Sequence, residues 1–224
     1  ILNVVIVLYG LFSLWKGKVP GRGVFLTMIL ISIPMAIAVH TVTAFLYNGL
    51  ASRPFWNSSI LAPRFIASAF CSGPAVLLVL LQVLRRVARF DVQNQVLWKL
   101  GELMAYAMGF NLFLLAAEVF KEFYSATENS RHIYYMFTGL DGHNAIVPYI
   151  WTSVVCSVLA FFILLIPKLR KHPVLLNVGC ALTFVGVYIE KGIGLVIPGL
   201  TPDALGEIYE YVPTLTELGV TAGI

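Results

Sequence analysis

Long runs of apolar residues alternate with short polar segments along the whole chain. Six runs cover residues 1–15, 24–50, 65–84, 96–120, 147–166 and 174–197, and a seventh begins at residue 215. A helix needs about 20 apolar residues to cross the bilayer core. Backbone groups in lipid must find partners within their own segment, so such runs form helices. The pattern predicts an all-α, polytopic transmembrane helix bundle with about six complete spans and the start of a seventh.

Both ends of the chain fall within apolar runs. The first run is shorter than the others, and the last one stops after residue 224. We therefore expect a single integral-membrane domain over residues 1–224 that is a fragment of a longer bundle, incomplete at both ends.

Composition excludes several other classes of protein. Hydrophobic residues make up 59% of the chain, charged residues 12%, and the mean hydropathy is +0.86, which leaves too little polar surface for a soluble domain. Cys71, Cys156 and Cys180 stand singly within apolar runs, so no disulfide framework or cysteine-ligated metal is indicated. The net charge of +4 comes from basic residues at the ends of spans, which argues against a nucleic-acid partner.

The positions of the basic residues predict the orientation. Ten of the 15 Lys and Arg residues lie in alternate connections and mark the cytoplasmic side. The connections around 51–63, 124–145 and 201–217 then face the periplasm, across a bacterial or archaeal cytoplasmic membrane. Their aromatic residues are either an interfacial belt or a docking platform for a partner; they are Trp56, Tyr134, Tyr135, Phe137, Tyr209 and Tyr211.

Four ionisable residues stand out inside the apolar runs, where each costs about 2.5–3.5 kcal/mol on insertion scales. They are His40, Glu102, Glu118 and Glu190. Helical spacing puts His40, Thr43 and Tyr47 on one face that leads toward the periplasm and suits a polar head group. The alternative is a buried histidine bonded to a neighbouring helix.

The three carboxylates differ in their surroundings. Glu102 follows Lys99 by one helical turn and is best explained as an interfacial ion pair. Glu118 shares a face with Asn111, and Glu190 adjoins Lys191 between glycines, so either that helix breaks there or the pair faces other helices. Two histidines at membrane depth would be needed to ligate a b-type haem, and only His40 has that position. Hydrolytic motifs are missing, and no metal site is expected.

Several stretches resemble the NrfD-like membrane subunits of the polysulfide reductase family. They are VHTVTAF at 39–45, RPFW at 53–56, APRFIASAFCSGPA at 62–75, IEKGIGLVIPG at 189–199 and EIYEYVPTLTELGVTAG at 207–223. The last two are most similar to the DsrP-type subunit of the membrane complex associated with sulfite reduction. The Hmc-type and Tmc-type subunits are closely similar alternatives. Members of the family have around ten spans.

The resemblance implies a haem-free subunit that reacts with menaquinone as its substrate and holds no iron–sulfur cluster. It implies a periplasmic ferredoxin-like iron–sulfur partner, together with a multihaem cytochrome c and further membrane subunits. His40 occupies the position of the family's quinone-site histidine and is the expected catalytic residue. Many members have an acidic residue shortly after that histidine, whereas this chain has Thr43 and Tyr47, which weakens the case for proton translocation.

The remaining site residues are expected to assist. Thr43, Tyr47 and Arg64 would bind the quinone with His40, although Arg64 is alternatively an interfacial anchor or a partner of Glu118 or Glu122. Glu118 and Glu190 are expected to relay protons, and Trp56, Tyr134 and Tyr135 to dock the partner.

Two other functions remain open. The glycines around Glu190 would suit a secondary transporter. A purely structural anchor for redox subunits would tolerate the loss of His40.

Overall fold

The structure of the chain is a computed structural model that describes residues 2–17, 19, 21–50, 52–88, 92–125, 130–203, 205–210 and 214–223. Two of the ten basic residues counted for the orientation, Lys18 and Arg89, and the aromatic residue Tyr211 lie outside the described residues.

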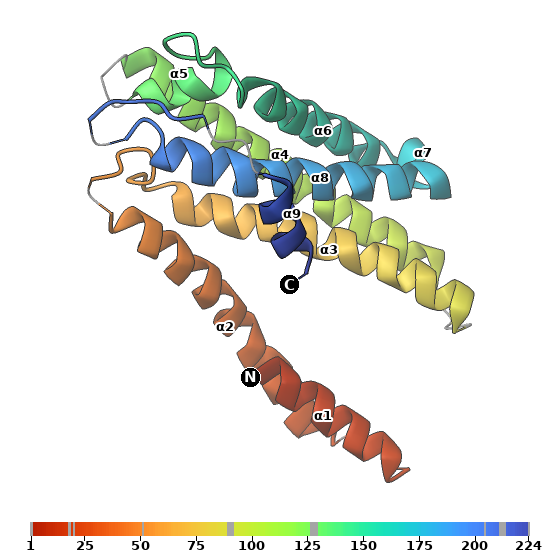
Figure 1. The fold of residues 1–224 in the computed structure, drawn as a ribbon. Coiled ribbons are helices and arrows are strands. Elements are labelled where there is room, and N and C mark those ends of the chain that lie inside the picture. Colours follow the sequence, from red (N-terminus) through yellow and green to blue (C-terminus); the bar gives the residue numbers. More distant parts are fainter. Residues whose placement is uncertain are drawn as a thin grey trace.

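The described residues form helices and contain no β-strand, which confirms the all-α prediction (Figure 1). The helices are α1 (Leu2–Trp15), α2 (Arg22–Asn48), α3 (Leu61–Val87), α4 (Asn94–Ser125), α5 (Arg131–Phe137), α6 (Val147–Leu165), α7 (Pro167–Arg170), α8 (Pro173–Leu200) and α9 (Leu215–Ala222).

Within the described residues, five helices are long and apolar enough to cross a membrane: α2, α3, α4, α6 and α8. The first predicted span is present as α1, but its 14 residues reach only about 21 Å at 1.5 Å per residue, so it is not a complete span among the described residues. The other five predicted spans are present, and three of their helices, α3, α4 and α8, extend past both ends of the apolar runs, α3 to include Arg64 and α4 to include Glu122.

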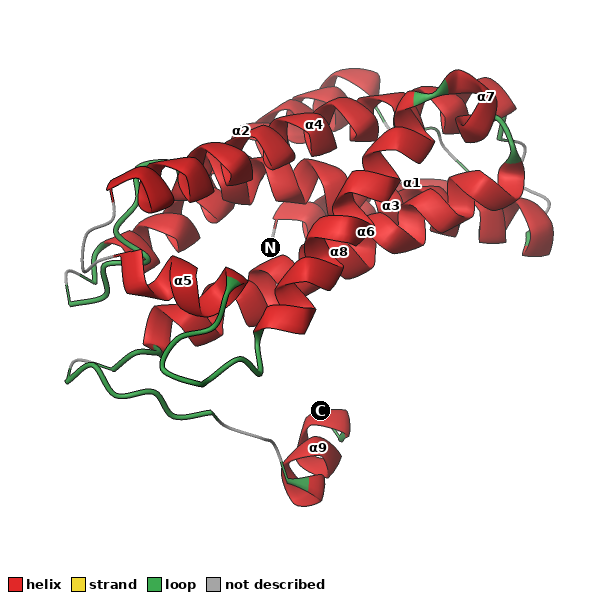
Figure 2. Ribbon diagram, turned by 90° about the horizontal axis from the view of Figure 1, so that it is seen from above, coloured by secondary structure: helices red, strands yellow, loops and turns green. Residues whose placement is uncertain are grey.

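Helices α3, α4, α6 and α8 pack into one bundle, in which α8 contacts both α6 and α3 (Figures 1 and 2). Three glycines of α8, Gly179, Gly186 and Gly194, lie against α6. A Cβ atom at Gly186 would lie 2.6 Å from the Ser157 hydroxyl and 3.3 Å from the Ser153 carbonyl. Small residues let membrane helices approach closely, so this stripe explains the tight α6–α8 pair.

The Gly186→Val substitution should therefore force α6 and α8 apart. We expect a loss of about 1–3 kcal/mol in the free energy of unfolding, the usual cost of overpacking, measured by denaturant titration in detergent. Gly192→Val on the same helix is the control, because a Cβ atom there meets nothing within 4 Å. Equal stability of the two variants would contradict this packing.

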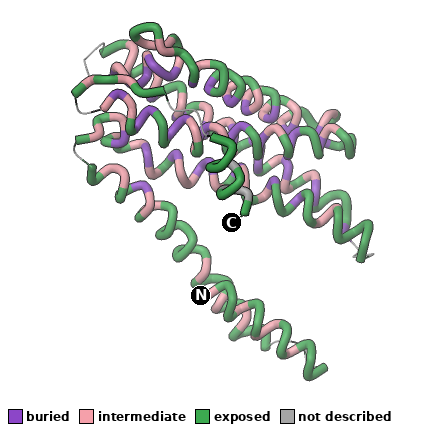
Figure 3. The backbone as a smooth tube through the Cα atoms, in the orientation of Figure 1, coloured by how far each residue is buried: buried purple, intermediate pink, exposed green. Residues whose placement is uncertain are grey.

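Helices α1 and α2 diverge from this bundle (Figure 1). Helix α2 contacts α3 and α1, and Ala44 is its one buried residue among those described. Figure 3 shows the rest of α2 as largely exposed. The apolar surface of α2 is therefore available to lipid or to further helices, and a groove opens between α2, α3 and α8.

The long connections gather at one end of the bundle, which we call the α5 end. It comprises the described residues 49–50 and 52–60, residues 130–146 with α5, and residues 201–203 and 205–210 (Figure 1). The opposite end, which we call the α7 end, holds the short basic turns. The alternation of the connections agrees with the predicted topology, while the side of the membrane that each end faces stays a prediction.

Candidate functional site

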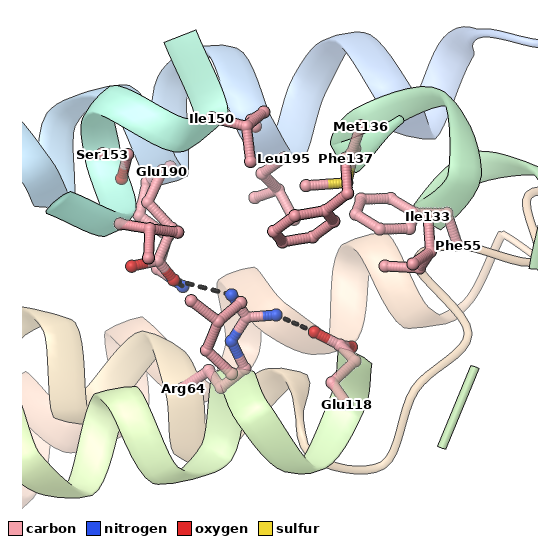
Figure 4. A pocket seen from close by; sticks show the side chains of 14 residues that line it. Phe55, Arg64, Glu118, Ile133, Met136, Phe137, Ile150, Ser153, Glu190 and Leu195 are labelled. Carbon is pink, nitrogen blue, oxygen red and sulfur yellow. Dashed lines mark hydrogen bonds and ion pairs between the residues drawn. The ribbon is translucent and has the colours of Figure 1, made fainter. Parts of the chain in front are cut away.

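A cluster of buried charges joins three helices in the half of the bundle near the α5 end. Arg64, in the first turn of α3, forms an ion pair with Glu118 of α4, and its Nη2 donates to Oε1 of Glu190 on α8 at 2.7 Å (Figure 4). The three residues are 6%, 6% and 9% exposed. Arg64 is therefore a bridge between two carboxylates from different helices.

Glu190 has two further partners. Nζ of Lys191 donates to its Oε1 at 2.9 Å, and Nδ2 of Asn111 donates to Oε2 at 3.0 Å. The cluster thus holds two cations and two carboxylates and is neutral in total. Charges taken out of water are tolerated when they are paired and hydrogen-bonded in this way.

Helical periodicity brings the α4 members to one face. Asn111, Leu114 and Glu118 are spaced by three and four residues and are all buried. This confirms that Asn111 and Glu118 share a face. Helix α8 continues unbroken through Glu190 and Lys191, so this pair faces other helices.

A small cavity borders the charge cluster on the side of the α5 end (Figure 4). Its apolar walls include Phe55, Ile133, Met136, Phe137 and Ile150. The volume of about 20 Å³ is enough for one water molecule and too small for an aromatic ring. The cavity is therefore not a binding site for an organic molecule.

A larger groove lies between α2, α3 and α8, on the other side of Lys191. Its volume is about 550 Å³, within the range of about 300–1,000 Å³ usual for ligand sites. The lining residues are His40, Phe65, Ser68, Ala69, Ser72, Gly73, Phe184, Val187, Tyr188, Lys191 and Gly192. His40 is exposed and forms no hydrogen bond with any described residue.

Lys191 is the link between the groove and the charge cluster. It lines both the groove and the small cavity, and its side chain is 17% exposed. Its Nζ binds Glu190 and lies 5.4 Å from the centre of the Phe65 ring. A ligand in the groove would thus meet His40 and, through Lys191, the buried carboxylates.

The structure separates the residues predicted to bind together. His40 lines the groove, whereas Thr43 and Tyr47 do not. The Thr43 hydroxyl donates to the Val39 carbonyl at 2.8 Å, and the Tyr47 ring packs edge-on against Trp56 with centroids 4.9 Å apart. Arg64 lies in the charge cluster and forms an ion pair with Glu118. This pairing was one of the alternatives that the sequence analysis left open.

The predicted docking residues are mostly internal. The Trp56 ring packs against Gly199, its Nε1 donates to the Leu195 carbonyl at 2.8 Å, and it is 4% exposed. Tyr135 is buried as well, and Tyr134 is half-buried beside Phe123. Of the three, only Tyr134 leaves part of its side chain accessible within this chain.

Sequence reasoning missed how the end of α8 is held. Nδ1 of His132 lies 2.6 Å from the Pro198 carbonyl, and Nη1 of Arg53 donates to the Leu200 carbonyl at 3.0 Å. Burial lowers the pKa of His132 and favours its neutral form. These side chains, with Trp56, satisfy carbonyls at the C-terminal end of α8 and fix it to the α5 end.

Lys191, Ser68 and Tyr188 were also not predicted to line a site. The one available signal was the spacing of Tyr188 and Lys191, which puts them on one face of α8.

Glu102 lies near Lys99 (3.4 Å) and Arg170 (3.3 Å), away from the groove. The described residues contain no group of three or more His, Cys, Asp or Glu side chains able to hold a metal ion.

The comparison with known proteins agrees with this architecture. Residues 7–202 match the family described as polysulphide reductase, NrfD. The chain is 28% identical over 249 aligned positions to a protein of Halobacterium salinarum named as a candidate membrane subunit of dimethyl sulfoxide reductase; the alignment covers 95% of this chain and 54% of that protein. It is 26% identical over 202 positions to a subunit of the selenate reductase of Mesobacillus selenatarsenatis, covering 86% and 46%.

The chain spans about half the length of these two curated relatives. The finer similarity to the DsrP-type subunit stays a prediction. The match over residues 7–202 and the five membrane-spanning helices confirm the family expected from the sequence motifs. The chain belongs to the NrfD, or polysulphide reductase, family of multi-pass membrane proteins.

Proposed function

We propose that this chain is the quinone-reactive membrane subunit of a respiratory redox complex. It exchanges electrons between menaquinol or menaquinone and an iron–sulfur partner subunit. The names of its relatives, subunits of a dimethyl sulfoxide reductase and of a selenate reductase, support a place in such a complex. The observation that carries the proposal is the groove that His40 lines together with a lysine paired with a buried carboxylate.

The groove fits a quinone head group in shape and chemistry. Phe65, Phe184 and Tyr188 supply aromatic surface for a flat ring. The groove borders α2, whose apolar surface is largely exposed, so a hydrophobic quinone would enter it from the lipid. His40 can donate to a quinone carbonyl or accept a quinol proton, because imidazole changes protonation near neutral pH.

Quinol oxidation releases two electrons and two protons. In our proposal, one proton passes to His40. Lys191 takes up the other after handing its own proton to Glu190, while Arg64 keeps its charge and holds Glu190 and Glu118 in place. Contacts of 2.9 Å and 2.7 Å join Glu190 to Lys191 and to Arg64, and Arg64 pairs with Glu118. Glu190 and Glu118 both border the small cavity on the side of the α5 end, where a water molecule would take the proton onward, so the carboxylates are proton-relay groups in this proposal.

The electrons leave through a partner. We propose that the α5 end faces the periplasm of a bacterial or archaeal cytoplasmic membrane and docks a ferredoxin-like iron–sulfur subunit. A multihaem cytochrome c and further membrane subunits make up the rest of the assembly. The partially accessible Tyr134 belongs to this docking face, while Trp56 and Tyr135 support it from inside.

Filling the groove tests the location of the site. Gly73 lines the groove, and a Cβ atom there meets nothing within 4 Å. The Gly73→Phe substitution should occupy the space of the ring and lower quinol oxidation by the assembled complex by about tenfold or more, through a loss of at least about 1.4 kcal/mol of binding. The readout is reduction of an artificial acceptor by a menaquinol analogue.

Gly23→Phe is the matched control, because Gly23 lies on α2 outside the groove and also has open space around it. Its activity should equal that of the wild type. Full activity of an assembled Gly73→Phe complex would contradict the groove as the quinone site. Movement of solute by the isolated chain would instead favour a transporter.

A further inference from the structure

A second groove lies at the α7 end of the bundle, between the last turns of α3 and the first turns of α8. Its volume is about 890 Å³. The lining residues are Val79, Gln82, Val83, Arg85, Arg86, Val87, Pro173 and Asn177. One part of this wall is apolar and the other part is basic, and neither part is used by the proposed quinone chemistry.

The basic part is not neutralised within the described chain. The Arg85 guanidinium donates to Oδ1 of Asn94 at 2.5 Å, a neutral partner. Arg86 is exposed and makes no hydrogen bond or ion pair with any described residue. No acidic side chain is among the described residues that line the groove. Among the residues that the structure describes, the two positive charges that face this space therefore have no counter-charge.

The beginning of α8 adds donors at the same place. Its N-cap residue His172 makes no side-chain cap, and its first turn contains no acidic residue. The uncapped N–H groups of a helix N-terminus carry partial positive charge. Gln82 donates to Oδ1 of the exposed Asn177 at 2.6 Å, and the amide nitrogen of Asn177 makes no hydrogen bond with any described residue.

We propose that this groove binds the head group of an anionic phospholipid. The phosphate would lie between Arg86, Arg85 and the start of α8, where guanidinium groups can bind its oxygens. An acyl chain would lie along Val79, Val83 and Val87, which are 44%, 50% and 78% exposed. This apolar wall selects a lipid over a free phosphate, and the site lies at the ends of two membrane-spanning helices, where head groups are located.

Lipid retention by the purified complex tests the assignment. The delipidated complex is equilibrated with equal amounts of phosphatidylglycerol and phosphatidylcholine, and retained lipid is counted by native mass spectrometry. The wild type should retain phosphatidylglycerol preferentially. Arg86→Gln should reduce that retention roughly fivefold, the usual effect of one basic residue near an anionic lipid.

Lys168→Gln is the control, because it removes one exposed charge at the same end but outside the groove. It should leave the retention unchanged, and an excess of glycerol phosphate should not displace the lipid. The proposal is overturned if Arg86→Gln retains as much phosphatidylglycerol as the wild type, if both lipids are retained equally, or if glycerol phosphate competes.

Discussion

Replacement of Arg64 with methionine is expected to destabilise the bundle by about 3–5 kcal/mol, the cost of removing one partner from a buried ion cluster. Arg64 is the cation that contacts both Glu118 and Glu190. Without it, two buried carboxylates face each other with Lys191 as their remaining cation. The measurement is the free energy of unfolding of the purified protein by denaturant titration in detergent.

Two controls separate this effect from a general loss of charge. The combination of Arg64→Met with Glu118→Gln removes the carboxylate that is left without a cation, keeps the Lys191–Glu190 pair and should recover much of the stability. Arg131→Met breaks an exposed ion pair with Asp141 at 3.1 Å and should cost about 1 kcal/mol or less. Arg64→Met and Arg131→Met variants of equal stability would show that the cluster does not hold the helices together.

His40→Ala is expected to lower quinol oxidation by about 10²- to 10⁴-fold, the usual contribution of a general acid–base group. His40 is exposed and has no hydrogen-bonding partner among the described residues, so its removal should leave the fold and the assembly intact. The measurement is the steady-state rate with a menaquinol analogue, with partner subunits quantified in the same preparation.

Thr41→Ala, one residue further along α2, is the control for this experiment. Its hydroxyl donates to the Ile37 carbonyl at 2.8 Å, and it does not line the groove. We expect wild-type activity from this variant. A fully active and assembled His40→Ala complex would remove His40 from the chemistry and favour a structural anchor.

The helices could be predicted because hydropathy and length alone determine whether a segment can span a bilayer. The pairing of Arg64 with Glu118 was among the alternatives that the sequence left open, since a buried cation needs an anion. The second bond of Arg64, to Glu190, depends on the close packing of α3 against α8. Hydropathy does not specify which helices become neighbours.

The groove could not be predicted for a related reason. It exists because α2 diverges from the bundle, which no local pattern in the sequence encodes. The stripe of His40, Thr43 and Tyr47 is real as a helical face, but seven residues correspond to about 10 Å along the axis. Only His40 therefore lies at the depth of Lys191, while Tyr47 reaches Trp56 near the α5 end.

The central claim is that a quinone reacts between His40 and Lys191. The most direct test is an experimental structure of the assembled complex with a naphthoquinone inhibitor bound. The proposal predicts the ring in the groove between α2, α3 and α8, with one carbonyl within hydrogen-bonding distance of His40. A ring bound elsewhere, with this groove filled by lipid or by another helix, would contradict it.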